Sequence, residues 1–432
     1  MALQFLVREA SAGVPTTTES RTTTPAVNIL LMAYTNRAVD EICEMLTDNA
    51  IDYLRIGNRY TCAEPYRDHL IDEVLEQYQS LREVKDRILK ARIIVGTTST
   101  IQNRTYLFAL KHFQLAIIDE ASQILEPQIV GLLTKADKFI LIGDYKQLPA
   151  VVAQRSQESA VSEPSLQDIA LTDCRNSLFQ RLIENELRHG RTDFIGTLNR
   201  QGRMHPDVAA FSCNAFYRRE EIRPVPLPHQ LETSLGYDAP SLDATDDLLK
   251  QHRVLFFPSQ FCREPGISDK VNADEARIVA SLVLRIARFY GTKFDAQKTI
   301  GIIVPYRNQI AMIRQAIERL TGPDDCRHDG CPDGLRPSQT TARQLKDIAI
   351  DTVERYQGSQ RDVIIYSFTI QQRYQLDFLA ANTIEEDGHL IDRKLNVALT
   401  RARRQLLLTG NPDILSHNPL FRELMEYVTK VK

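Results

Sequence analysis

The feature that most constrains the fold is an apolar run that ends in two adjacent acids. Residues 115–118 read Leu-Ala-Ile-Ile and are followed at once by Asp119 and Glu120. Such a run is typical of a buried parallel strand, whose carboxyl end lies at the edge where open α/β sheets bind ligands. There, one carboxylate can hold Mg²⁺ while its neighbour orients or deprotonates a water, as nucleoside-triphosphate hydrolysis requires. A lone Asp-Glu pair can equally begin a solvated loop, so only the rest of the chain can distinguish a catalytic pair from a loop.

Similar apolar runs recur along the chain and alternate with helical patterns. They lie at residues 28–33, 92–95 and 139–142, and again at 253–257, 300–304, 363–367 and 405–409. Alternation at this spacing predicts α/β domains with parallel, doubly wound sheets. We expect a first domain at 1–190, with a short helix at 2–9 and a polar helical insertion at about 60–91, and a second at 191–432. The stretch 321–345, rich in Gly, Pro, Asp and Thr, reads as an insertion.

Composition sets the class of the protein. Hydrophobic residues make up 43% and charged residues 25%, and 53 basic against 56 acidic residues give a net charge of −3. Any nucleic-acid binding must therefore come from local patches. Seven scattered cysteines suggest no disulfide framework. The sequence has neither a signal peptide nor an apolar stretch of about 18–20 residues, so we expect a cytoplasmic protein. Cys326, His328 and Cys331 are half a zinc site at best.

Further polar clusters follow the predicted strands or lie between them. Residues 143–149 read Gly-Asp-Tyr-Lys-Gln-Leu-Pro, a glycine turn with an acid and an amide that can hydrogen-bond a phosphate oxygen or an attacking water. Residues 199–206 read Asn-Arg-Gln-Gly-Arg-Met-His-Pro, and residues 305–309 read Pro-Tyr-Arg-Asn-Gln. Two more clusters lie at 351–362 and 395–403, the second at the end of a probable helix. Singly each is weak, because Arg203 or Arg401 alone is usually a surface or ion-paired residue.

In this order the clusters resemble the motifs of the superfamily 1 helicases. The resemblance is to the branch that contains RNA-surveillance helicases and the helicase part of replication nuclease-helicases. Residues 35–40 and 96–98 are similar to its strand-binding motifs, and residues 119–122 to its Walker B motif. Residues 201–206, 305–309, 352–358 and 397–401 complete the series. The resemblance implies two RecA-like P-loop NTPase domains with ATP bound between them.

The resemblance also implies a role for each matched residue. Asp119 would hold Mg²⁺, Glu120 would activate water, and Gln147 would sense the γ-phosphate. Arg203 and Arg401 would be arginine fingers that neutralise charge in the transition state. The nucleotide would also contact Asp144, Arg307 and Gln360, and single-stranded or partly duplex DNA or RNA would contact Thr35, Asn36, Thr97, Thr98, Pro305, Tyr306 and Thr352.

Two residues depart from the family pattern without weakening the resemblance. Gln360 stands where the family usually has an acid, which puts the contact to the nucleotide ribose in doubt. Gly202 replaces the customary aromatic residue beside Arg203, which would loosen that loop.

A third departure is more serious, because no Gly-x-x-x-x-Gly-Lys-Ser/Thr loop occurs in the 432 residues. That loop cradles the phosphates with backbone N–H groups and a lysine. We expect a chain that starts just downstream of it, with the loop supplied by an upstream domain or a separate chain. Without the loop we expect weak ATP binding and an inactive motor in the chain as given.

The leading interpretation is an ATP-dependent helicase motor. A rival is a non-hydrolysing nucleic-acid- or protein-binding module on the same scaffold. A third interpretation, a P-loop signalling ATPase without nucleic acid, fits poorly with the strand-binding motifs at 35–40, 96–98 and 305–309. Retention of Glu120, Gln147, Arg203 and Arg401 favours the motor, because a binding module has no need of arginine fingers.

Overall fold

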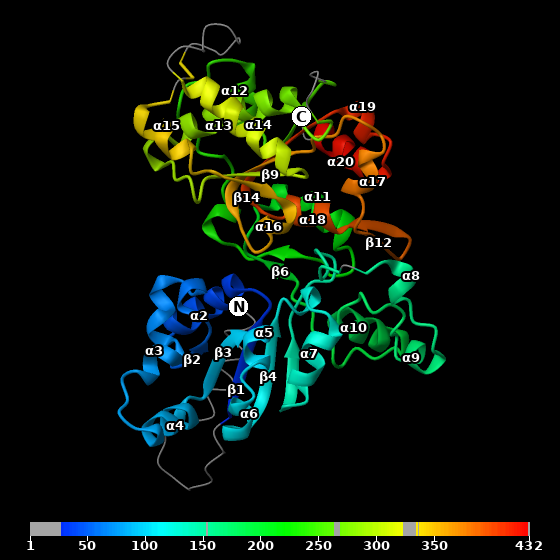
Figure 1. Ribbon diagram of the computed structural model, residues 1–432. Coiled ribbons are helices and arrows are strands. Elements are labelled where there is room, and N and C mark those ends of the chain that lie inside the picture. The colour runs from blue at the N-terminus through cyan, green and yellow to red at the C-terminus, as the bar shows by residue number, and fades with distance from the viewer. Residues whose placement is uncertain (1–26, 153, 263–267, 323–333, 336, 431–432) are drawn as a thin grey trace. The chain divides into compact units, whose positions relative to one another are not determined.

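The computed structural model describes residues 27–152, 154–262, 268–322, 334–335 and 337–430. The helix expected at 2–9 and the pair Cys326 and Cys331 lie outside these residues. Contacts divide the chain into two compact units (Figure 1). Unit 1 comprises Met1–Tyr145 and Pro149–Gly196, and unit 2 comprises Lys146–Leu148 and Thr197–Lys432.

Unit 1 is built on a five-stranded parallel sheet in the order β2-β3-β1-β4-β5. Alternate residues of β1 divide between two apolar clusters. Leu30 and Met32 pack on one face with residues of α5 (Thr98–Gln102) and α7 (Glu126–Leu133). Ile29 and Leu31 pack on the other face with residues of α2 (Asn36–Asp48). The strands are β1 (Ile29–Ala33), β2 (Leu54–Ile56), β3 (Ile93–Thr97), β4 (Phe113–Asp119) and β5 (Ala136–Leu141).

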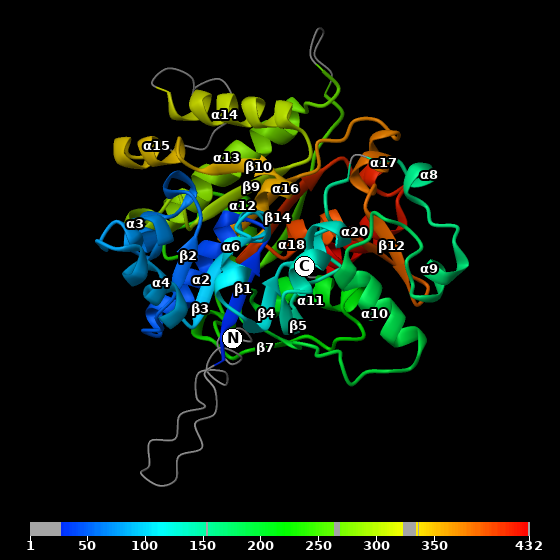
Figure 2. The ribbon, with the colours of Figure 1, turned by 60° about the horizontal axis from the view of Figure 1, so that its bottom comes forward.

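The helices of unit 1 cover this sheet and fill its connections (Figures 1 and 2). Two of them, α3 and α4, lie between β2 and β3, within the stretch where a helical insertion was expected. The helices are α2 (Asn36–Asp48), α3 (Ile71–Leu75), α4 (Leu81–Lys90), α5 (Thr98–Gln102), α6 (Tyr106–Leu110), α7 (Glu126–Leu133), α8 (Ser156–Ser159), α9 (Pro164–Asp168) and α10 (Leu178–Arg188).

Unit 2 holds a second five-stranded parallel sheet, in the order β10-β9-β11-β14-β8. Its strands also divide alternate residues between two cores. Ile364 and Tyr366 of β11 join one cluster, and Val363 and Ile365 join the other. The strands are β8 (Val254–Pro258), β9 (Ile300–Val304), β10 (Ala349–Thr352), β11 (Arg361–Ser367) and β14 (Ala402–Gly410).

Helices lie on both faces of this second sheet, with two small strand pairs beside it. The pairs are β6 (Arg200–Gln201) with β7 (Arg223–Pro224), and β12 (Thr383–Glu386) with β13 (His389–Asp392). The helices are α11 (Pro206–Phe216), α12 (Ala244–Gln251), α13 (Ala273–Tyr290), α14 (Arg307–Thr321), α15 (Gln339–Leu345), α16 (Val353–Tyr356), α17 (Gln375–Leu379), α18 (Arg393–Leu399), α19 (Pro412–Leu415) and α20 (Pro419–Lys430).

Two parallel sheets confirm the expected α/β fold class, and several details differ from expectation. Strands β2 and β10 were not predicted, because edge strands of three and four residues show no clear periodicity. Residues 339–345 form α15, although the sequence there reads as an insertion. Arg403 lies inside β14 and not at the end of a helix. Among the described helices, none is long and apolar enough to cross a membrane.

Gly301 tests the packing of the second sheet. A Cβ at this position in β9 would lie 2.9 Å from Cγ of Arg361 and 3.0 Å from Cδ1 of Ile364. We expect Gly301→Ala to lower the free energy of unfolding by about 1–3 kcal/mol through overpacking. Gly131→Ala in α7 is the matched control, because no atom lies within 4 Å of its Cβ. Urea denaturation measures both, and equal midpoints for the two variants would contradict the expectation.

Candidate functional site

The predicted site residues of unit 1 gather at the carboxyl edge of its sheet. Ala33 at the end of β1 pairs with Thr97 of β3 on one side and with Asp119 of β4 on the other. Because parallel strands end at the same edge, the residues that follow them lie near one another. The structure therefore brings together the predicted residues Thr35, Asn36, Thr97, Thr98, Asp119 and Glu120.

The backbone at Glu120 is in a conformation that L-residues rarely adopt. Its φ is 53° and its ψ is 35°, in the left-handed region. The Glu120 N–H donates to Oδ1 of Asp119 at 3.0 Å, and the Gln123 amide donates to Oε2 of Glu120 at 2.6 Å. Such strain persists only where surrounding contacts hold it, and it concentrates at functional sites. The turn therefore fixes both carboxylates relative to the strand end.

The Asp119 carboxyl is suited to a metal cation. Burial raises the pKa of Asp119, and the hydrogen bond from Glu120 opposes that rise. A buried carboxylate gains from a nearby cation, because the cation offsets the loss of hydration. The described residues include no group of three or more potential metal-binding side chains. Mg²⁺ fits this donor set, since it usually binds through one or two carboxylates together with phosphates and water.

Asp144 lies beside this acid turn. Gly143 approaches so closely that a Cβ there would lie 2.9 Å from the backbone nitrogen of Ser122. The Ser122 hydroxyl accepts from the Asp144 N–H at 3.3 Å, and the Ala121 N–H donates to the Ile142 carbonyl at 2.8 Å. These contacts tie the segment after β5 to the segment after β4, so Asp119 and Asp144 belong to one edge.

Two predicted nucleic-acid residues of unit 1 cap helices. The Thr35 hydroxyl accepts from the Ala38 N–H at 3.2 Å at the start of α2, and the Thr97 hydroxyl accepts from the Thr100 N–H at 3.1 Å at the start of α5. Thr35 is exposed, whereas Thr97 and Thr98 are 7% and 4% exposed. A structural role thus accounts for both hydroxyls, and their contact with nucleic acid stays a prediction.

Residues of four separate motifs meet at the amino edge of the unit 2 sheet. Arg203 donates to Oε1 of Gln360 at 3.3 Å and to the Thr400 carbonyl at 3.4 Å. Arg401 donates to the Thr400 hydroxyl at 3.0 Å and to Oε1 of Gln147 at 3.2 Å. Gln360 directly precedes β11, and Thr400 and Arg401 precede β14. The four predicted nucleotide-site residues around Thr400 therefore form one continuous cluster.

Lys146 is a residue whose importance the sequence did not reveal. It is 1% exposed, and its ammonium lies 2.7 Å from Glu220 and 2.5 Å from Glu386. Its carbonyl accepts from the Asn396 amide at 2.8 Å. These contacts anchor the segment Lys146–Leu148, and with it Gln147, in unit 2. The carboxylate partners are far along the chain, so no local pattern indicates the anchor.

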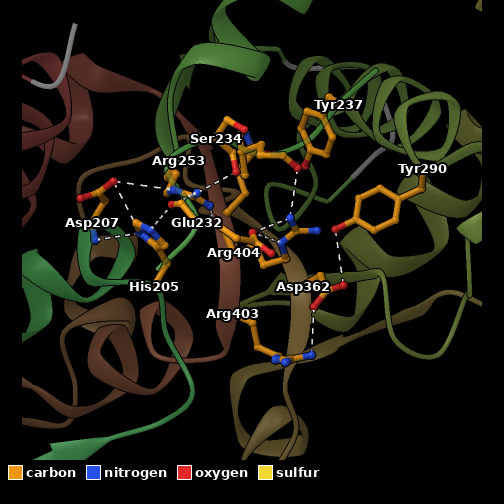
Figure 3. A network of polar contacts seen from close by, with 12 residues as sticks. His205, Asp207, Glu232, Ser234, Tyr237, Arg253, Tyr290, Asp362, Arg403 and Arg404 are labelled. Atoms are coloured by element: carbon orange, nitrogen blue, oxygen red, sulfur yellow. Dashed lines mark hydrogen bonds and ion pairs between the residues drawn. The ribbon is translucent and has the colours of Figure 1, made fainter. Parts of the chain in front are cut away.

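A polar network holds the loop that carries Arg203 (Figure 3). The backbone N–H of His205 donates to the Arg403 carbonyl at 2.7 Å, and the ring Nε2 of His205 lies 2.9 Å from the Glu232 carbonyl oxygen. Arg253 donates to the Glu232 carbonyl at 2.8 Å, and Arg404 pairs with the Glu232 carboxylate at 2.6 Å. Burial and the charge of Arg253 lower the pKa of His205. His205 is therefore a neutral packing residue of the loop.

The other predicted site residues of unit 2 lie at the opposite, carboxyl edge of the sheet. Pro305 and Tyr306 follow β9, and Thr352 ends the neighbouring strand β10. Arg307 is the exposed first residue of α14 at this edge. The structure does not bring Arg307 to Gln360, because β9 and β11 run parallel and the two residues lie beyond opposite ends of them. Arg307 thus lies with the predicted nucleic-acid residues.

Comparison with known families agrees with the motif order. A model described as "AAA domain" matches residues 174–413, more than half of the chain. A second model with the same description matches residues 63–155. The two matches together cover most of the described part of the chain.

Relatives with helicase names match most of this chain. The "DNA replication ATP-dependent helicase/nuclease DNA2" of Xenopus laevis is 28% identical over 92% of this chain and 34% of its own length. The "DNA replication ATP-dependent helicase/nuclease JHS1" of Arabidopsis thaliana is 28% identical over 97% and 28%. The "DNA polymerase alpha-associated DNA helicase A" of Saccharomyces cerevisiae is 26% identical over 78% and 45%. The chain thus spans less than half the length of each of these relatives.

The family matches and the motif series identify the same kind of protein. The chain belongs to the AAA-domain family, and it is similar to superfamily 1 helicases of the replication nuclease-helicase type.

Proposed function

We propose that the chain is the ATP-driven motor of a helicase that moves on single-stranded or partly duplex DNA. The observation that carries this proposal is the cluster at the amino edge of the unit 2 sheet. There Gln147, Arg203, Gln360 and Arg401, from four motifs, are joined by hydrogen bonds through Thr400. A module that only binds nucleic acid or protein does not require two guanidinium groups and two amides gathered at the starts of strands.

Unit 1 supplies the acids of the reaction. Asp119 would bind Mg²⁺, which when bound neutralises phosphate charge and orients the β- and γ-phosphate oxygens. Glu120 would accept the proton of the attacking water, because it directly follows Asp119 at the end of β4 and hydrogen bonds hold its turn. Asp144 lies at the same edge and would contact the nucleotide site through water or metal.

Unit 2 supplies the cations of the reaction. Arg203 and Arg401 would neutralise charge that develops on the transferred phosphoryl group. Gln360 gives Arg203 a neutral hydrogen-bond partner where the family usually has an acid. A neutral partner holds a guanidinium less strongly than a carboxylate does. Gln147 contacts Arg401 and would report the state of the γ-phosphate to unit 2.

The choice of substrate rests on the relatives. The Xenopus protein's name combines a helicase with a nuclease, whereas the yeast protein's name gives a DNA helicase alone. This chain aligns with both, so the segment they share with it is the helicase. Both names include DNA, and we propose DNA as the substrate of this chain on that basis. Sugar-phosphate contacts at the carboxyl edges of the two sheets would follow a strand without reading its sequence.

Nucleotide titration tests the consequence of the missing phosphate loop. Without the loop's backbone N–H groups and lysine, we expect weak binding of ATP. Asp119→Asn is the matched variant, and it should remove the Mg²⁺ dependence of whatever binding remains. Fluorescence of a labelled ATP analogue with and without Mg²⁺ measures both effects. Tight, Mg²⁺-dependent binding by this chain would refute the expectation.

Substitution of Arg307 tests whether the carboxyl edge of the unit 2 sheet binds a nucleic-acid strand. We expect Arg307→Ala to weaken binding of a fluorescein-labelled single strand and to reduce the slope of log affinity against log salt by about 1, because one phosphate contact is lost. Arg319→Ala, at an exposed position in the last turn of the same helix, is the control and should change neither quantity. If Arg319→Ala weakened binding as much as Arg307→Ala, the assignment of this edge would be wrong.

A further inference from the structure

A row of four aromatic side chains lies at the carboxyl edge of the unit 2 sheet. Tyr306 follows β9 and stacks on Phe378 of α17, with ring centroids 5.0 Å apart and planes 19° apart. Tyr374 precedes Phe378 by four residues, a spacing that places both on one side of the helical turn. Tyr374 and Phe261 line one cavity of about 230 Å³. The row therefore runs from Tyr306 through Phe378 and Tyr374 to Phe261.

Three of the four side chains in this row are exposed. Tyr306 is 8% exposed and serves as the packed base, whereas Phe378 is 44%, Phe261 is 53% and Tyr374 is 61% exposed. Several large aromatic groups exposed at one edge often mark a site of interaction. Flat exposed rings favour a partner that also has flat faces, because stacking buries apolar area on both sides.

Cations lie around the rings. The Lys270 ammonium is 5.9 Å from the centroid of Tyr306, and Arg307 is the next residue after Tyr306 and is exposed. The Lys394 ammonium lies 4.2 Å from the centroid of Phe378 and pairs with Glu354 at 3.3 Å.

Two acids near the row limit where an anionic strand can run. The Tyr374 hydroxyl donates to the Asp269 carboxylate, so this acid is engaged by the ring itself. Asp377 is exposed on α17. Lys270 and Arg307 would therefore attract the phosphates of a strand to the Tyr306 end of the row. Rings beside a line of cations match the combination that binds single strands, in which bases stack while phosphates meet positive charge.

We propose that Tyr374, supported by Phe378 and Phe261, stacks on unpaired bases of the nucleic acid that the motor follows. The proposal deepens the proposed function and rests on it, since it adds base stacking to the sugar-phosphate contacts expected at this edge. Every base has a π-face, so the surface accepts any sequence. Bases in a duplex are already stacked and paired, so the surface discriminates single strands from duplexes.

The bond between Tyr374 and Asp269 allows a sharp test. Tyr374→Phe keeps the ring and removes the hydroxyl, whereas Tyr374→Ala removes both. Tyr60 in unit 1 is 92% exposed and provides the matched control for loss of an exposed tyrosine. The probes are two fluorescein-labelled strands of equal length, one of thymidines and one of abasic sites, and fluorescence anisotropy measures the affinity of the full chain for each.

We expect the full chain to bind the thymidine strand more tightly than the abasic strand. Tyr374→Ala should weaken binding of the thymidine strand by about 5-fold or more and leave the abasic strand unchanged. Tyr374→Phe and Tyr60→Ala should bind both strands as the unaltered chain does.

Other outcomes overturn the proposal in distinguishable ways. If the full chain binds both strands equally, or if Tyr374→Ala weakens both to the same extent, stacking is refuted and backbone binding stands. If Tyr374→Phe loses as much as Tyr374→Ala, the hydroxyl and its bond to Asp269 are what matters, and stacking is again refuted. If the full chain binds neither strand, the proposed function itself fails.

Discussion

In unit 1, the register of β1 with both of its neighbours decides which residues meet at the carboxyl edge of the sheet. Thr97 and Asp119 flank Ala33 because β3 and β4 pair in parallel with the same strand. That register depends on the division of apolar side chains between two cores, since a shift of one residue would turn Leu30 and Met32 to the opposite face. The left-handed turn at Glu120 directly follows β4, and hydrogen bonds with Asp119 and Gln123 hold it.

Unit 2 uses the two edges of its sheet for two purposes in the proposed function. Arg203 and Arg401 meet at the amino edge, where Thr400 links them. Tyr306 and Arg307 lie at the carboxyl edge, with the exposed aromatic row beside them. Both edges belong to one sheet that is buried on both faces, so in the proposed function one packed unit carries both sets of contacts.

Much of this arrangement follows from the sequence, because strand ends in a parallel sheet share an edge. The positions of Asp119 and Glu120 were predictable from the apolar run before them. The separation of Arg307 from Gln360 was predictable too, because Arg307 follows a strand whereas Gln360 precedes one. The prediction nevertheless assigned both residues to the nucleotide, because it relied on their motifs alone. The short edge strands β2 and β10 could not be predicted, because few residues carry their pattern.

Contacts between distant residues were also beyond the sequence. Lys146 reads as a surface lysine, and only the fold brings Glu220 and Glu386 to its ammonium. Likewise, the spacing of Tyr374 and Phe378 is visible in the sequence, but Tyr306 joins them only through the packing of α17 against the end of β9.

The central claim is that one chain couples a nucleotide site to a nucleic-acid site. The most direct test measures the affinity for single-stranded DNA with and without a non-hydrolysable ATP analogue, at a concentration whose occupancy is verified by titration. Coupling between sites is typically worth about 5-fold or more in affinity and is reciprocal. The account predicts such a change, and it predicts that Arg401→Ala removes it. Equal affinity for DNA in the presence and absence of bound nucleotide would contradict the motor and favour a simple binding module.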